Sequence, residues 1–187
     1  MVPQKNGRPR RYDFVSRLMG GHGPGALAAA ALDELSERVF DQIEDLGARE
    51  LAFSADGSSL TIGNLVRHLA WAEASWMRRI AEVDMPRELD RMLQPLGADR
   101  LTSPEDSAGL PGPRASELID LCRRVREQIT LPALQRPDTL NRKIDADKGP
   151  CTAREVLAHL IWHWTYHSGH IGLLRQIGGS GFRWSFA

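Results

Sequence analysis

The 187-residue chain contains only two cysteines, Cys122 and Cys151, which do not form a C-x-x-C motif. Two such thiols make no disulfide framework, so the sequence predicts a reducing, cytoplasmic location. The chain also has no run of about 18 apolar residues, which argues against a membrane-spanning helix. Its basic first residues lack the apolar core of a signal peptide.

The chain also has no excess of positive or negative charge. The 24 Lys and Arg residues balance the 24 Asp and Glu residues, and the formal net charge is +0. Such a chain has no global field that would attract nucleic acid or an anionic membrane, so we expect neither as a partner. Its length favours one domain. We expect residues 1–24, which combine arginines with a Gly-rich stretch, to be a flexible N-terminal arm, and residues 25–187 to be the folded domain.

Apolar residues recur at three- and four-residue spacing in four segments, and this period predicts amphipathic helices. No strand pattern competes with them, so the fold class expected is all-α, with four helices in a bundle. The predicted helices cover residues 26–47, 61–82, 114–132 and 152–178.

Local signals mark where these helices end and what joins them. Gly47 is expected to stop the first helix, and Pro132 and Pro137 the third. The longest connection is 83–112, in which a short helix about 86–93 is expected, while 133–151 shows no strong element. The fourth helix has the clearest boundaries, because Thr152 and Glu155 form a capping box and Gly178-Gly179 supplies a C-terminal stop.

The most informative window is HLIWHWTYHSGH, residues 159–170, which holds four of the six histidines. At about 100° per residue, these four lie within roughly 80° of one another on the apolar face of the last helix. Burying an imidazole without a partner costs about 1–3 kcal/mol. A pair four residues apart can instead share one metal ion, at about 2.0–2.1 Å for zinc. The histidines of the window are His159, His163, His167 and His170.

A third ligand must come from another helix, and His68 is the one histidine left besides His22 of the arm. The spacing of the histidines alone leaves two interpretations open: a three-histidine metal site, and core histidines that hydrogen-bond one another. A zinc peptidase motif needs Glu directly after its first histidine, but Leu160 follows His159 and Trp164 follows His163. A di-iron site needs Glu-x-x-His pairs, which are also missing.

Three stretches carry a family resemblance: SSLTIGNLVRHLAWAEASWM at 58–77, CTAREVLAHLIWHWTYHSGHIGLLRQIGG at 151–179 and GFRWSF at 181–186. Through them the chain resembles the DinB/YfiT-like superfamily, which includes mycothiol-dependent maleylpyruvate isomerase-like and bacillithiol transferase-like proteins. The resemblance implies a DinB/YfiT-type four-helix bundle with a long connection between helices 2 and 3.

The resemblance also implies one divalent metal, with zinc or nickel expected. It maps the family's first ligand onto His68 and its paired ligands onto His163 and His167. Where relatives carry Arg-Gly-Gln after the last ligand, this chain carries Ser168-Gly169-His170, so His170 has no role assigned by the family.

Characterised relatives use mycothiol, bacillithiol or glutathione. The resemblance therefore implies a metal-dependent S-transferase or isomerase with a thiol cosubstrate and a small-molecule substrate, and a homodimer is the candidate assembly. Tyr166, His170 and Arg175 are the candidate catalytic residues, beside the metal ligands or the substrate. Three alternatives remain: a metal-dependent hydrolase, a non-catalytic metal- or ligand-binding protein connected with stress, and a purely structural bundle.

The remaining aromatic and sulfur side chains are interpreted as structural. Aromatic bulk suits the core of a helical bundle, so all five tryptophans are expected to pack there. Cys122 is expected to be a small core residue, and Cys151 a thiol without a role near the start of the last helix. The tryptophans are Trp71, Trp76, Trp162, Trp164 and Trp184.

Overall fold

A computed structural model describes residues 5–8, 23–55, 60–93, 114–136, 138–146 and 149–183. This part of the chain is mostly helical, as the sequence predicts, and adds a small antiparallel sheet. None of its helices combines the length and the apolar character needed to cross a bilayer.

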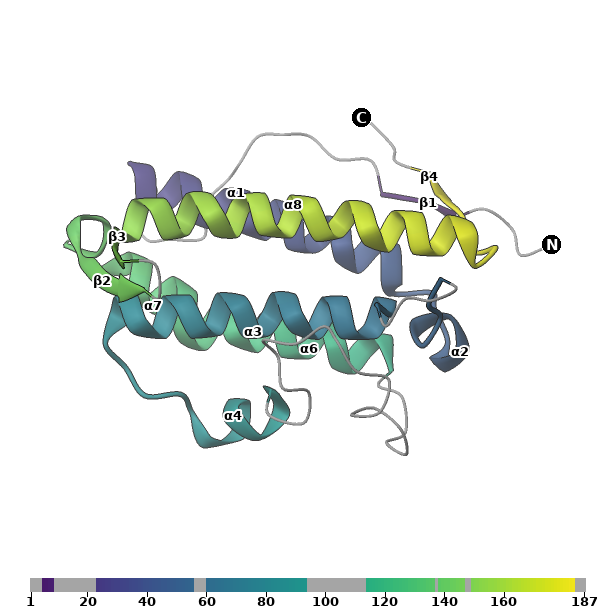
Figure 1. Cartoon of the computed structure of the whole chain (residues 1–187), viewed down its shortest axis with the longest axis horizontal. Coiled ribbons are helices and arrows are strands. Elements are labelled where there is room, and N and C mark those ends of the chain that lie inside the picture. The colour runs from purple at the N-terminus through teal and green to yellow at the C-terminus, as the bar shows by residue number, and fades with distance from the viewer. Residues whose placement is uncertain are drawn as a thin grey trace.

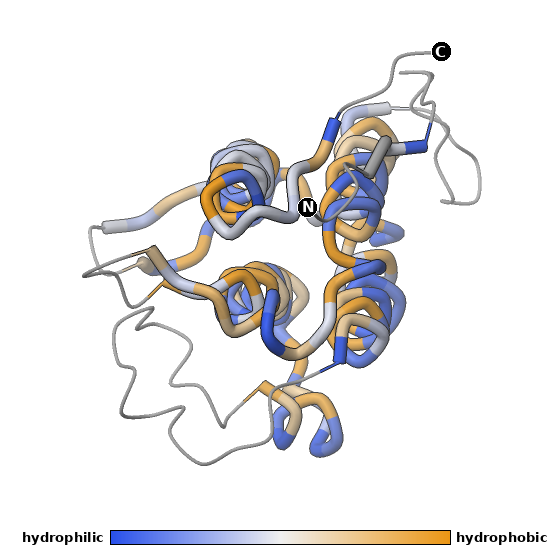
Figure 2. The backbone as a smooth tube through the Cα atoms, turned by 90° about the vertical axis from the view of Figure 1, so that its right-hand side faces the viewer, coloured by the Kyte–Doolittle hydropathy of each residue, from blue (hydrophilic) through white to orange (hydrophobic). Residues whose placement is uncertain are grey.

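The long helical segments lie side by side around a common interior (Figures 1 and 2). The helix α1 packs along α8, and α3 packs against both α6 and α8. Between α6 and α7 the helix continues through a π-helical turn, η2. The segments are α1 (Pro24–Ile43), α3 (Ile62–Ala81), α6 (Ala115–Val125), η2 (Arg126–Thr130), α7 (Leu131–Gln135) and α8 (Ala153–Ile177).

Short elements connect these segments. The predicted short helix in the long connection is present as α4 (Arg87–Leu93), while 94–113 lie outside the described residues. The others are α2 (Ala48–Leu51) and η3 (Thr139–Asn141), with the strands β1 (Lys5–Asn6), β2 (Lys143–Ala146), β3 (Gly149–Thr152) and β4 (Phe182–Arg183).

The capping signals of α3 and α8 are confirmed. Thr61 accepts a hydrogen bond from the Asn64 backbone N–H at 3.1 Å. Thr152 and Glu155 form the predicted capping box. After α8 the chain turns at Gly179, whose φ of 78° is the left-handed conformation that glycine adopts most readily. The start and the end of the histidine-bearing helix therefore follow from local sequence.

Two predicted helix ends are wrong. The first helix ends at Ile43, and Gly47 instead precedes α2, where its backbone N–H donates to Glu50 Oε2 at 3.1 Å. The third helix passes through Pro132, which lacks an N–H and would clash with the carbonyl four residues earlier. In η2 the Leu131 N–H donates to the Arg126 carbonyl, five residues back, and this wider turn lets the helix continue to Gln135.

The prediction of no strands is also wrong. The strands β2 and β3 pair antiparallel, with Lys143 opposite Thr152 and Ala146 opposite Gly149. The Ala153 N–H donates to the Arg142 carbonyl at 2.9 Å, so this hairpin holds the first residue of α8. The sequence of β2, KIDA, alternates polar and apolar residues and its burial alternates with them, but β3 lacks this pattern, and a single run of four residues is a weak signal.

Part of the predicted arm packs against the other end of the chain. The strand β1 pairs in parallel with β4, and the Gly7 N–H donates to the Arg183 carbonyl at 2.8 Å. A Cβ at Gly7 would lie 2.8 Å from the Phe182 ring, so glycine allows this close approach. Arg8 pairs with Asp41 of α1. The rest of the arm, 1–4 and 9–22, lies outside the described residues.

Candidate metal centre

Three histidine nitrogens converge between α3 and α8. The Nε2 atom of His163 lies 3.0 Å from Nε2 of His68 and 3.2 Å from Nε2 of His167. The four-residue spacing places His163 and His167 on one side of α8, and His68 faces them from α3. One ligand atom from each of the three lies within 4.8 Å of the others. The structure thus brings together the three side chains that the sequence singled out as metal ligands.

The separations of 3.0 and 3.2 Å from His163 fit a shared divalent ion. Bonds of about 2.0–2.1 Å in a tetrahedral arrangement place neighbouring ligand nitrogens about 3.3 Å apart. Hydrogen bonds alone explain the cluster less well, because an imidazole nitrogen has one proton or one lone pair, and Nε2 of His163 has two nitrogen neighbours. Within the described part of the chain, Nδ1 of His163 is buried without a hydrogen-bond partner.

Burial keeps the two histidines of α8 in the form that binds metals. It lowers the pKa of His163 to about 3, and repulsion from His167, His68 and His159 acts in the same direction. Burial also lowers the pKa of His167 to about 4. Both imidazoles are therefore neutral near pH 7, and a neutral ring offers a lone pair to a cation.

His170 lies behind one of the three histidines. Its Nδ1 atom is 3.3 Å from Nδ1 of His167, on the side of that ring away from the convergent Nε2 atoms. Groups in this position fix the tautomer and the orientation of a ligating histidine. The Tyr166 ring packs edge-on against both His170 and His167, with centroids 4.4 and 5.1 Å away. Two of the predicted catalytic residues therefore adjoin the centre.

Arg175, the other predicted catalytic residue, is engaged elsewhere. It is 1% exposed and lies near the C-terminal end of α8. Its guanidinium donates to both carboxylate oxygens of Asp45, at 2.8 and 3.0 Å, and to the Ser180 carbonyl at 2.7 Å. It also donates to the Gln42 carbonyl. These bonds join α8 to the end of α1 and occupy the side chain away from the three histidines.

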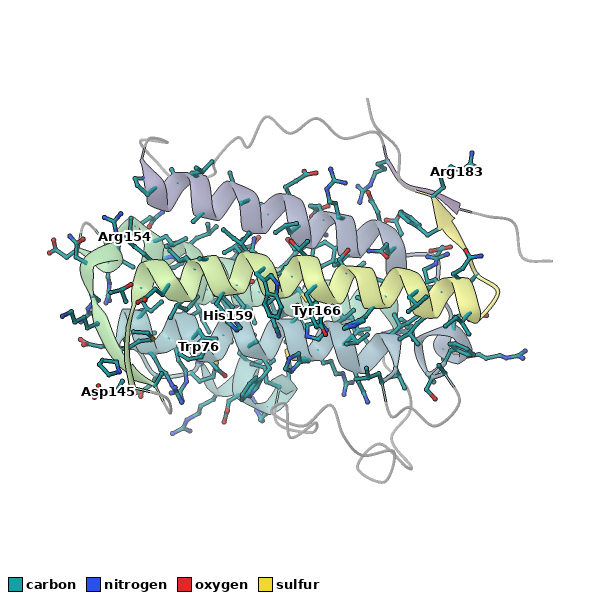
Figure 3. The ribbon with its side chains drawn as sticks, turned by 45° about the horizontal axis from the view of Figure 1, so that its top comes forward. Trp76, Asp145, Arg154, His159, Tyr166 and Arg183 are labelled. Atoms are coloured by element: carbon teal, nitrogen blue, oxygen red, sulfur yellow. The ribbon has the colours of Figure 1, made fainter. Side chains whose placement is uncertain are left out.

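An aromatic rim borders the candidate centre on both helices. Trp162 stacks on Tyr166 with centroids 4.8 Å apart and an interplanar angle of 17°. On α3, Trp71 stacks over His68, and Trp76 meets His159 of α8 edge-on. Figure 3 labels Trp76, His159 and Tyr166 along this side of the molecule.

The expectation that every tryptophan packs in the core is wrong for one of them. Trp164 is buried, at 1% exposed, but Trp162 is 53% and its neighbour Tyr166 48% exposed. Residues two positions apart lie on nearly opposite sides of a helix, so the indoles of Trp162 and Trp164 have different surroundings. Trp184 lies outside the described residues.

A buried charged cluster beside the centre is not among the features predicted from the sequence. Glu73 and Arg126 are almost fully buried and form a two-pronged ion pair. Burial opposes the charge on Arg126, yet the charges and hydrogen bonds of Glu73 and Asp33 together outweigh it and raise the pKa of Arg126. A signal was present, because Glu73 falls four residues after Leu69 on the apolar stripe of α3. A carboxylate at such a position needs buried partners.

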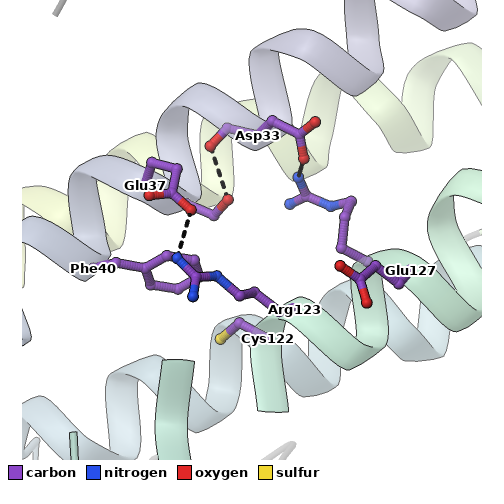
Figure 4. Close-up of a pocket in the computed structure, with 8 residues that line it drawn as sticks. Asp33, Glu37, Phe40, Cys122, Arg123 and Glu127 are labelled. Carbon is purple, nitrogen blue, oxygen red and sulfur yellow. Dashed lines mark hydrogen bonds and ion pairs between the residues drawn. The ribbon is translucent and has the colours of Figure 1, made fainter. Parts of the chain in front are cut away.

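The outer side of this cluster reaches a cavity of about 310 Å³ between α1 and α6–η2. Figure 4 shows it, with Asp33 bonded to a guanidinium and Glu37 bonded to Arg123. Phe40 and Cys122 also line this cavity. None of the three convergent histidines does, so the cavity is separate from the candidate centre.

Comparison with known families gives a match over most of the chain. A family model described as Mycothiol-S-transferase matches residues 27–178, a range that includes all three convergent histidines. The comparison with curated proteins gave no match.

Proposed function

Because the chain belongs to the mycothiol-S-transferase family, we propose that it is a metal-dependent thiol S-transferase. In this proposal His68, His163 and His167 hold one divalent ion, with zinc or nickel as the expected metal. The observation that carries it is the convergence of three Nε2 atoms from two helices, with two of the rings neutral. The family supports transferase chemistry and dependence on a thiol.

The finer assignments are part of the same proposal. The thiol is mycothiol, with bacillithiol and glutathione as alternatives, and the acceptor is a small molecule. The long helices form a DinB/YfiT-type four-helix bundle over residues 25–187, preceded by the arm at 1–24. The protein acts in the cytoplasm, and a homodimer is its assembly.

His68, His163 and His167 would hold the divalent ion without adding charge, and the ion would lower the pKa of the thiol cosubstrate and so supply a nucleophilic thiolate. The residues of the chain prepare that site. His170 orients the His167 ring from behind. Trp162 and Tyr166 offer a half-exposed stacked surface for the acceptor. Arg175 stabilises the end of α8 and takes no part in the reaction.

The test combines metal analysis with turnover. Protein purified without a His-tag or chelator should contain about one equivalent of a divalent metal. It should conjugate mycothiol to 1-chloro-2,4-dinitrobenzene, and the same assay with glutathione and bacillithiol ranks the thiols. His167→Ala should lose both metal and turnover, whereas Leu173→Ala, an exposed site on the same helix, should keep both.

Two outcomes would favour other functions. Less than about a tenth of an equivalent of metal would contradict the metal centre. A full equivalent of metal without turnover of any thiol would contradict the transferase proposal. Hydrolysis of ester substrates would then indicate the metal-dependent hydrolase, and tight binding without chemistry would indicate a metal- or ligand-binding protein.

A further inference from the structure

Glu73 is the centre of a buried cluster that draws on four helical segments. Arg126 of η2 donates through Nε to Glu73 Oε1 at 2.6 Å and through Nη2 to Oε2 at 2.9 Å. The Thr130 hydroxyl donates to Oε1 at 2.6 Å, and the Trp164 indole N–H to Oε2 at 2.9 Å. Arg126 also donates to Asp33 of α1 at 2.6 Å. Glu73 thus receives four hydrogen bonds from protein side chains.

One of these bonds crosses the same helix pair as the candidate metal centre. Glu73 follows His68 by five residues on α3, and Trp164 lies between His163 and His167 on α8. The Glu73–Trp164 bond therefore joins the two ligand-bearing helices next to the ligands. A directional bond in this place restrains how α3 and α8 slide and rotate against each other.

Stability alone explains this cluster poorly. Taking a carboxylate and a guanidinium out of water costs several kcal/mol each, and well-packed apolar residues of similar volume often stabilise a core at least as well. Directional bonds instead specify one arrangement of the helices. The π-helical turn contributes to it, because Arg126 and Thr130, its first and last residues, reach the same carboxylate.

We propose that Glu73, through its hydrogen bond to Trp164, is a positioning residue that sets the relative placement of His68 and the histidine pair of α8. The inference rests on the proposed metal centre. Glu73 touches neither the ion nor the thiol in this proposal, and it acts through the helix that carries the ligands.

The test compares two variants that each remove one hydrogen bond from Glu73. Trp164→Phe removes the bond to the ligand-bearing helix and leaves the ion pair with Arg126 intact. Thr130→Val removes a bond of similar length that comes from η2, a segment without ligands. A third variant, Leu157→Ala, removes buried volume from α8 without touching Glu73, and so controls for the smaller ring of phenylalanine.

The main readouts are Co²⁺ binding and the visible absorption spectrum of the Co²⁺-loaded protein, which report the arrangement of the ligands. All three variants should melt at lower temperature than the parent. Only Trp164→Phe should also shift the Co²⁺ bands and weaken Co²⁺ binding by about tenfold. Equal spectra and affinities in Trp164→Phe and Thr130→Val, or equal changes in both, would overturn the inference.

A metal-free readout separates this inference from the proposed function. Long-range ¹H–¹⁵N spectra of the apo protein report the tautomers of the histidine rings. Trp164→Phe should change the tautomers of His163 and His167, whereas Thr130→Val should leave these tautomers unaltered. A parent protein that binds no Co²⁺ contradicts the metal centre itself. Unchanged tautomers in Trp164→Phe contradict the positioning role of Glu73, whether or not metal binds.

Discussion

The Nε2 atoms of His68 and His163 lie 3.0 Å apart, although 95 residues separate them in the chain. Two imidazoles that meet in this way, with His167 beside them, form a site whose geometry depends on the packing of α3 against α8. Side chains that orient the rings or hold the helices should therefore affect metal binding without contacting the ion.

His170 provides the first case. His170→Ala removes the group behind His167, so the ring of that ligand becomes less well fixed. We expect metal affinity to fall by about tenfold, at the lower end of what such supporting residues contribute. Competition with a chromophoric chelator measures the change. Leu173→Ala is the matched control, and an equal loss of affinity in both variants would contradict the orienting role of His170.

Trp162 is expected to affect binding of the acceptor substrate and not binding of the metal. Its ring is half-exposed and stacked on Tyr166, and aromatic stacking contributes about 0.5–1.5 kcal/mol. Trp162→Ala should therefore raise KM for an aromatic electrophile by about fivefold, with metal content unchanged. Steady-state kinetics with 1-chloro-2,4-dinitrobenzene and with the aliphatic iodoacetamide make the comparison. A similar rise for both compounds would contradict stacking.

Arg175 should prove structural. Arg175→Met leaves two buried backbone carbonyls and the 38%-exposed Asp45 without their donor, and an unsatisfied buried acceptor costs about 1–3 kcal/mol. We expect a lower free energy of unfolding in urea, together with about one equivalent of metal in the fraction that remains folded. Loss of turnover with unchanged stability would instead indicate a direct role in the reaction.

The two cysteines should differ in reactivity. Cys122 is buried, its thiol lies 3.9 Å from the Val66 carbonyl, and burial raises the pKa of that thiol well above its usual range. Cys151 is partly exposed on β3. A thiol reagent such as Ellman's should therefore modify one cysteine in the native protein and two in guanidinium chloride. Cys151→Ser should abolish the native reaction, and rapid native labelling of Cys122 would show that the core opens.

Local signals in the sequence account for much of the fold. The capping box at Thr152 and Glu155 and the glycines after Ile177 give the bounds of α8 within one residue, because both act over one turn of the helix. The pair His163 and His167 is predictable for the same reason. Helical spacing alone decides that two side chains four residues apart share a face.

Features that depend on distant contacts were harder to predict. Spacing could offer His68 only by elimination, because its position opposite α8 results from helix packing, and the family resemblance was needed to assign it. Pro132 predicts a helix end when it is judged locally, because the π-helical turn that accommodates it leaves no local signal in the sequence. Glu73 carried a clue, a charge on an apolar stripe, but its partners lie 53 and more residues away.

The three-histidine metal centre is tested most directly by anomalous X-ray diffraction from crystals of the protein purified with its native metal. One anomalous peak should appear at about 2.0–2.1 Å from the Nε2 atoms of His68, His163 and His167 if the metal is zinc. A crystal without an anomalous peak between α3 and α8, or with its metal bound by other residues, would contradict the assignment.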